Sequence, residues 1–237
     1  AHASFSGDQR TTFCADDGRA TIVPILTGLS VTGFPVVTHD IAGYVSATNP
    51  PSPRDLFWRW TSLGALAPVL LTHHGRAIFD NWRWNRDPET IQHFKTWSDL
   101  HTRWWPLWAG LAREAAQTGA PIVRPQALYA PEELDGHGIK DQFMIGDDLL
   151  GAPVVTASTS ERSVQLPKGR WFNMQGGLPV DGPTTIMVDA PLGALPLFAR
   201  SGAVVPELAQ DIDTLVSVTS TATTLDMVRD RRVVRVW

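Results

Sequence analysis

The chain has 237 residues, of which 43% are hydrophobic and 19% are charged, and its formal net charge is -4. This composition can supply a sizeable buried core and does not require disorder. Lys and Arg are scattered, and no run approaches the ~18 apolar residues of a membrane helix, so neither nucleic acid nor a membrane is expected as a partner. We expect a soluble protein of one or two domains, with a cytoplasmic location favoured and its oligomeric state open.

The cysteine content limits the chemistry further. Cys14 is the only cysteine, so the chain can form neither an intrachain disulfide nor a CxxC redox pair. We expect Cys14 to be a packing residue. The sequence implies no organic cofactor and no metal.

The first half alternates short apolar runs with helical patterns, as parallel barrels and doubly wound sheets do. The patterns predict strands at 1–6, 34–37 and 69–72, and helices at 20–29, 54–67 and 87–117. Pro106 should kink or divide the last helix, and Gly119 should cap it. After residue 120, short Val- and Leu-rich runs interrupted by Gly and Pro are typical of an antiparallel β-sandwich, and 214–218 and 233–237 also read as strands.

Three consecutive predicted strands end in polar residues, namely Asp8, Asp40 and His73. In a parallel barrel these ends lie side by side on the face where active sites form. Glycoside hydrolysis requires a carboxylic acid that protonates the leaving oxygen and a second carboxylate that attacks or activates water. Asp8 and Asp40 are candidates by residue type.

Several segments then resemble one family in the same order. Residues 5–9 resemble the W-x-G-D-[NQ] segment that holds the acid/base Asp of glycoside hydrolase family 31. Residues 33–44 are similar to its G-x-P-f-x-x-x-D-I-G-G-[FY] segment, and 59–68 to its R-W-x-Q-x-G-A-F-x-P helix. Thr72-His73 looks like the strand end that bears a substrate-binding His, and 119–125, 142–153 and 195–202 resemble the junction with the following β-domain.

The resemblance implies an α/β fold in which 1–120 form the second, C-terminal half of a (β/α)8 TIM barrel. Residues 121–206 would form an antiparallel β-sandwich, and 207–237 the start of a further β segment. Asp8 would be the general acid/base of a retaining α-glycosidase acting on an oligosaccharide or α-glycoside. The residues expected to bind the substrate are Asp40, His73, Tyr44, Phe5 and Gln9.

The family's nucleophilic Asp lies on an earlier barrel strand, so we expect it upstream of this chain, in the missing N-terminal half of the same enzyme. The chain alone is then expected to be inactive. Phe5 replaces the usual Trp, Ala42 a Gly, and Leu71 an Arg of the family pattern. These departures affect the detailed sugar subsite.

Terminal α-linked glucose-type sugars are the favoured substrates. Residues 7–9, 16–18, 40–44 and 80–82 also look like the sulfoquinovosidase branch of the family, in which Tyr44 would lie near the sulfonate. Sulfoquinovosidase is therefore the alternative function, and α-xylosidase is a third.

Two readings of other classes stay open. A non-catalytic carbohydrate-binding fragment could stack sugars on some of the ten Trp residues, of which those beside loop-like polar residues are Trp58, Trp60, Trp82, Trp84, Trp104 and Trp105. A metal-dependent hydrolase could use His39, Asp40, His73 and His74 as ligands. Asp8 could also be a simple turn residue, Asp40 a cap, and His39 a packed neighbour.

Overall fold

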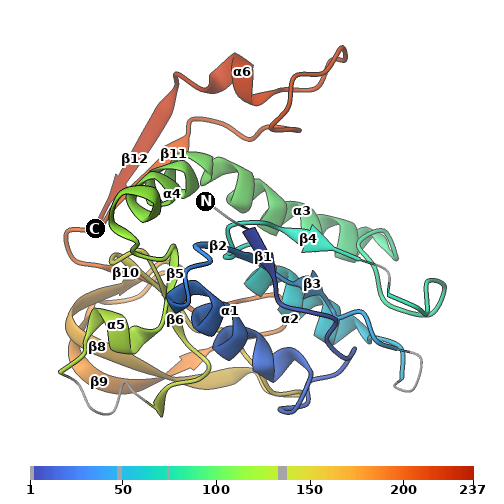
Figure 1. Ribbon diagram of the computed structural model, residues 1–237, viewed down its shortest axis with the longest axis horizontal. Helices are drawn as coiled ribbons and strands as arrows, with labels where there is room; N and C mark the ends of the chain where they lie inside the picture. Colours follow the sequence, from blue (N-terminus) through green and yellow to red (C-terminus); the bar gives the residue numbers. More distant parts are fainter. Residues whose placement is uncertain (1–2, 47–49, 74, 133–137) are drawn as a thin grey trace.

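The computed structural model describes residues 3–46, 50–73, 75–132 and 138–237. Its first half alternates short strands with helices (Figure 1), in the order β1 (Ala3–Phe5), η1 (Arg19–Thr21), α1 (Ile22–Val31), β2 (Val36–Thr38), β3 (Asp40–Ile41), α2 (Arg54–Gly64), β4 (Leu71–Thr72), α3 (Pro88–Arg103) and α4 (Trp105–Thr118). The predicted βα alternation is thus present, with shorter strands than the apolar runs suggested.

The short strands pair in parallel. β1 pairs with β2 from Ala3 opposite Val36 onward, and β3 pairs with β4 with Asp40 opposite Leu71. Only His39 separates β2 from β3, so these two strands are successive parts of one extended segment between β1 and β4. Parallel neighbours place their carboxyl ends on the same edge, which brings the ends of the three predicted strands together.

The helices follow their local signals. Asp87 caps α3 by accepting a hydrogen bond from the Thr90 N–H at 2.7 Å, and a proline occupies the first turn of that helix. The long helical pattern does divide near Pro106, because α3 ends at Arg103 and α4 begins at Trp105. Gly119 ends α4 with φ +80°, the left-handed conformation expected of a glycine cap.

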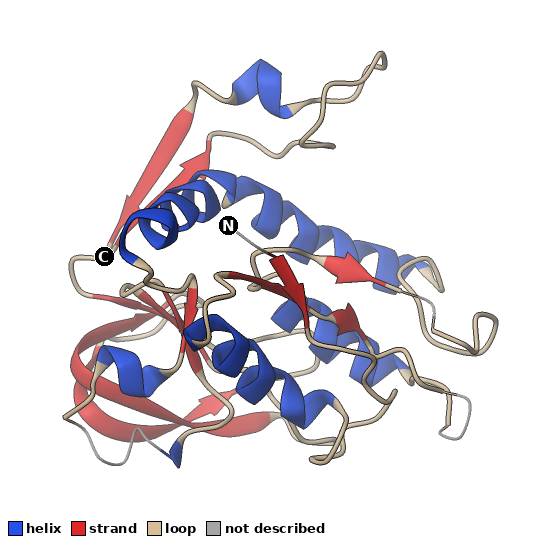
Figure 2. Cartoon of the chain, in the orientation of Figure 1, coloured by secondary structure: helices blue, strands red, loops and turns tan. Residues whose placement is uncertain are grey.

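The second half is built on one antiparallel sheet of order β5-β6-β7-β10-β8-β9. Figure 2 shows the long, curved strands of this sheet beside the helices of the first half. Its elements are β5 (Val123–Arg124), α5 (Gln126–Tyr129), β6 (Phe143–Ile145), β7 (Leu149–Gly151), β8 (Glu161–Asn173), β9 (Val180–Asp189) and β10 (Leu197–Arg200). Met144, Val164, Trp171 and Phe198 are buried in its own core cluster.

The last segment differs in part from the prediction. β11 (Val204–Leu208) pairs antiparallel with β12 (Arg232–Val236), and α6 (Leu225–Val228) lies between them in the chain. The strand predicted at 214–218 is wrong: the segment makes one bridge, from Thr214 to Thr224, and Val216 is 64% exposed. Apolar residues alone do not make a strand without a partner for the backbone.

Two buried arginines join the halves. Arg19 donates to the Val154 carbonyl and, at 2.8 Å, to the carbonyl of Arg59. Arg59, on α2, donates to the carbonyls of Pro191 at 3.0 Å and Thr159 at 2.7 Å. A single core cluster extends across the same junction and includes Trp60 and Trp104 from the first half and residues of the sheet such as Phe143.

Candidate functional site

The three predicted strand-end residues are brought together. Asp40 lies in β3, His73 directly follows β4, and Asp8 lies three residues beyond β1. The charges of both His73 and Asp8 act on the carboxyl group of Asp40, as expected for groups that share one edge of a parallel sheet. The spacing of polar residues after apolar runs was sufficient to predict this grouping.

The two carboxyl groups differ in environment. Asp40 is 4% exposed, whereas Asp8 is exposed. Burial raises the pKa of Asp40, the neighbouring His73 opposes that rise, and the charge of Asp8 adds to it. The site therefore combines one solvent-accessible carboxyl group with one that is shielded from water.

The turn after Asp40 fits closely against the Asp8 turn. Tyr44 and Val45 donate their backbone N–H groups to the Gln9 carbonyl at 2.8 and 2.9 Å. A Cβ added to Gly43 would lie 2.7 Å from the Arg10 carbonyl oxygen, so only glycine fits there. Ala42 has φ +69°, a left-handed conformation that costs a residue other than glycine roughly 1 kcal/mol.

Gln9 is placed beneath the Asp8 turn. It is 2% exposed, its amide nitrogen donates to the Ser6 carbonyl at 2.8 Å, and its amide oxygen accepts from the Ser6 hydroxyl at 3.0 Å. These bonds hold the turn that carries Asp8. Phe5, at the end of β1, is 41% exposed.

The rings of Tyr44 and His73 pack edge to face with their centroids 4.9 Å apart. The Nδ1 atom of His73 accepts a hydrogen bond from the Gly75 N–H at 3.0 Å. When the ring is neutral, its proton is consequently on Nε2, which is left as a hydrogen-bond donor. A sugar hydroxyl is a suitable acceptor for such a group.

Sequence reasoning missed the residues that fasten the loops after β3 and β4 to each other. Asn81 is 3% exposed and accepts a hydrogen bond from the Ser52 N–H at 2.9 Å. The Ser46 hydroxyl accepts from the Ala77 N–H at 3.0 Å. Residues 80–82 were noted only for their resemblance to the sulfoquinovosidase branch. Nothing in the sequence shows that Asn81 bonds to a residue about 30 positions earlier in the chain.

His39 and several Trp residues belong to the core. His39 is 1% exposed, accepts a hydrogen bond from Trp60 Nε1 at 2.9 Å, and has its pKa lowered to about 3 chiefly by burial. Trp60 and Trp104 are fully buried, so they cannot stack on a sugar, whereas Trp84 is 41% exposed. His39 is likewise unavailable as a metal ligand.

Within the described ranges, no group of three or more His, Cys, Asp or Glu side chains is placed to hold a metal ion. His74, one of the ligands considered above, lies outside the described residues. None of the helices that the structure describes has the length and apolar character needed to cross a bilayer.

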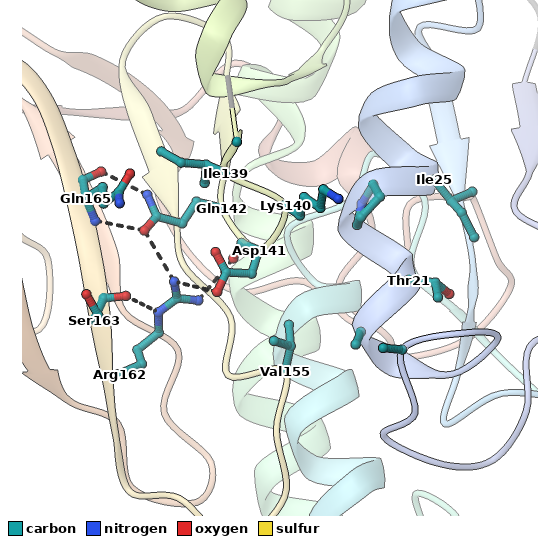
Figure 3. A pocket seen from close by; sticks show the side chains of 14 residues that line it. Thr21, Ile25, Ile139, Lys140, Asp141, Gln142, Val155, Arg162, Ser163 and Gln165 are labelled. Carbon is teal, nitrogen blue, oxygen red and sulfur yellow. Dashed lines mark hydrogen bonds and ion pairs between the residues drawn. The ribbon is translucent and has the colours of Figure 1, made fainter. Parts of the chain in front are cut away.

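A pocket of about 1050 Å³ lies elsewhere, between α1 and β8 (Figure 3). Its polar groups bond to one another: Arg162 lies 3.2 Å from Asp141, and Gln142 both accepts from the Gln165 N–H at 2.8 Å and donates to its carbonyl at 2.9 Å. None of the predicted site residues lines this pocket. These bonds lie within the sheet half and join the segment before β6 to β8.

Comparison with known proteins matches the two halves to consecutive parts of one family. Residues 1–111 match the glycosyl hydrolases family 31 TIM-barrel domain, and 119–205 match the glycosyl hydrolase family 31 C-terminal domain.

Individual relatives agree. The chain is 32% identical to the sulfoquinovosidase of Escherichia coli (strain K12) over 83% of this chain and 29% of the relative, and 29% identical to alpha-glucosidase 2 of Bacillus thermoamyloliquefaciens over 86% and 26%. A family 31 sulfoquinovosidase from E. rectale, solved with an aza-sugar inhibitor, superposes with a TM-score of 0.79 at 26% identity, covering 84% of this chain and 30% of that one.

The chain spans less than a third of the length of these curated relatives. Its fold is the C-terminal part of a (β/α)8 barrel followed by an antiparallel β-sandwich domain, as predicted. The chain belongs to glycoside hydrolase family 31.

Proposed function

We propose that this chain is part of a retaining α-glycosidase and that Asp8 is the general acid/base. The observation that carries the proposal is the grouping of two exposed residues, Asp8 and His73, with the buried Asp40 at adjoining strand ends. An acid/base residue must reach both the leaving oxygen and water, and the exposure of Asp8 supports that role. Asp40 is better suited to binding, because its carboxyl group is shielded.

In the proposed reaction Asp8 protonates the glycosidic oxygen while a carboxylate from the upstream part of the enzyme attacks the anomeric carbon. Asp8 then removes a proton from water, which releases the covalent glycosyl-enzyme with retention of configuration. Asp40 and the Nε2–H of His73 hold sugar hydroxyls and orient the ring for attack. Tyr44 and Phe5 complete the proposed sugar site, and Gln9, predicted as a sugar-binding residue, is buried against Ser6 and instead supports the turn that carries Asp8.

The proposed substrates are terminal α-linked glucose-type sugars. A family 31 dextranase from Flavobacterium johnsoniae, solved with glucose, is 28% identical to this chain. Sulfoquinovosides are the second candidate, favoured because relatives named sulfoquinovosidase match 83% of this chain at 32% identity.

We also propose a division of the chain into three parts. Residues 1–120 form the barrel half, 121–206 the β-sandwich and 207–237 a further β segment.

The test uses Asp8→Ala in the full-length protein. Without the acid, glycosides with poor leaving groups should be cleaved roughly 100- to 10,000-fold more slowly, whereas activated aryl glycosides should lose far less in the glycosylation step. Aryl α-glucosides and aryl α-sulfoquinovosides are assayed in parallel by released phenol. Asp16→Asn, an exposed carboxylate nearby in the chain, is the matched control.

Equal loss on both kinds of leaving group would remove Asp8 from the acid role. Absence of cleavage by the unaltered full-length protein, with sugar binding retained, would favour the non-catalytic carbohydrate-binding reading. Preference for the glucoside supports a glucose-type substrate, and preference for the sulfoquinovoside selects the second candidate.

A further inference from the structure

Arg76 follows the third strand end and lies against Tyr44. Its guanidinium carbon is 5.9 Å from the centroid of the Tyr44 ring, and that ring packs edge-on against His73. A guanidinium at this distance is attracted to an aromatic ring. The Tyr44 ring therefore contacts both the Arg76 guanidinium and His73, the residue that we propose binds a sugar hydroxyl.

The backbone fixes where Arg76 begins. Its N–H donates to the Tyr44 carbonyl at 3.2 Å. A Cβ on the preceding Gly75 would lie 2.7 Å from the same oxygen, so the loop can approach this closely only with glycine there. On the other side the Ala77 N–H bonds to Ser46. The main chain at Arg76 is thus held to the loop that follows Asp40.

Arg76 differs from the neighbouring Arg10 in its charged partners. Among residues that the structure describes, it is exposed and takes part in no ion pair, whereas Arg10, at the neighbouring strand end, lies 3.8 Å from Asp16 and 3.7 Å from Asp17. Asp8 and Asp40, at the adjoining strand ends, are the acidic groups of the proposed sugar site. They would repel an anionic sugar unless a cation stood beside it.

We propose that Arg76 is a specificity-determining residue that binds an anionic substituent, a sulfonate or carboxylate, on the sugar. This inference rests on the proposed function in that the sugar occupies the same site. A guanidinium presents a planar pair of donors that matches two oxygens of such a group. A neutral glucose would leave Arg76 to solvent, so the gain is confined to charged sugars.

The inference is tested by binding, which does not require turnover. Calorimetry on the full-length protein compares glucose with 6-deoxy-6-sulfoglucose for the unaltered protein, Arg76→Gln and Arg113→Gln; Arg113 is an exposed arginine on α4. Arg76→Gln should weaken binding of the sulfonated sugar roughly tenfold to hundredfold and leave glucose binding within about twofold. Arg113→Gln should alter neither, and added salt should weaken only the binding of the sulfonated sugar.

Three outcomes would overturn the assignment: no preference of the unaltered protein for the sulfonated sugar, an Arg76→Gln protein that keeps that preference, or equal loss for both sugars. The same titrations on Asp8→Ala separate this inference from the catalytic one. If Asp8→Ala retains the preference while its hydrolysis pattern contradicts an acid role, only the catalytic proposal falls. If instead Asp8→Ala shows the leaving-group dependence expected of a lost acid, and Arg76→Gln keeps the preference for the sulfonated sugar, only the role of Arg76 is overturned.

Discussion

Asp40 illustrates how a binding residue can oppose folding. Burial raises its pKa, so the folded protein binds a proton on this carboxyl group more tightly than the unfolded chain does. The stability linked to that proton is present at acidic pH and is lost as the pH rises through the raised pKa. At neutral pH the buried charge of Asp40 therefore lowers the free energy of unfolding.

We expect Asp40→Asn to unfold with a free energy equal to or higher than that of the unaltered protein at pH 7, and the difference to vanish under acidic conditions where Asp40 is protonated. Sugar binding should fall by tenfold or more, since an amide cannot replace an ionised acceptor. Urea titrations at a series of pH values measure the first effect and calorimetry the second. Asp181→Asn, whose side chain is 77% exposed, is the control and should change neither.

Among elements, the turn from Asp40 to Tyr44 depends on conformation more than on side-chain chemistry. Gly43 combines φ +77° with a close approach to the Arg10 carbonyl, Gly33 has φ +101° with open space around it, and Gly28 lies inside α1 with nothing within 4 Å. Substitution at Gly28 therefore tests helix propensity alone, and substitution at Gly33 tests backbone strain alone. Substitution at Gly43 tests backbone strain together with steric overlap.

A graded response to alanine should follow. Gly28→Ala should stabilise the protein by about 0.5–1 kcal/mol, Gly33→Ala should destabilise it by roughly 1–2 kcal/mol, and Gly43→Ala should cost more than either because strain and overlap add. Only Gly43→Ala should also reduce sugar binding. Urea unfolding measures the order, and a Gly43→Ala protein as stable as Gly33→Ala would show that the turn relaxes.

Elements with strong local signals could be predicted from the sequence, including the division of the long helix near Pro106 and its glycine cap. The grouping of Asp8, Asp40 and His73 could also be predicted, because parallel strands leave their carboxyl ends on one edge. The support from Asn81 and Ser46 could not, since it depends on how two loops meet in space. The strand predicted at 214–218 was wrong for the same reason, because strand propensity does not show whether a pairing partner exists.

At the scale of the whole molecule, three histidines are buried among the residues that the structure describes, namely His39, His93 and His101. Burial lowers the pKa of His39 to about 3 and of His93 to about 4, and it lowers that of His101 as well. His93 stacks on Trp58 with ring centroids 4.3 Å apart and His101 Nδ1 lies 3.0 Å from the Ala65 carbonyl. The unfolded chain binds protons at these positions below about pH 6.5, whereas the native protein binds them only at lower pH.

Stability should therefore fall as the pH decreases from about 6.5 towards 4, with each such histidine adding a slope of up to about 1.4 kcal/mol per pH unit. The Asp40→Asn background is best for this measurement, because it removes a carboxyl group whose linkage has the opposite sign. His93→Gln should reduce the slope measured by urea unfolding. A free energy of unfolding that stays constant between pH 6.5 and 5 would contradict the expectation.

The arginines at the junction have a consequence for how such proteins can be recombined. Arg19 and Arg59 come from the barrel half, and burial lowers the pKa of Arg19 to about 9, so it keeps its charge at neutral pH. Both donate to main-chain oxygens of the sheet half rather than to carboxylates. A chimera that joined this sheet to a foreign barrel without them would strand those oxygens away from water. The two halves are expected to be inherited together, and successful grafts should carry both arginines.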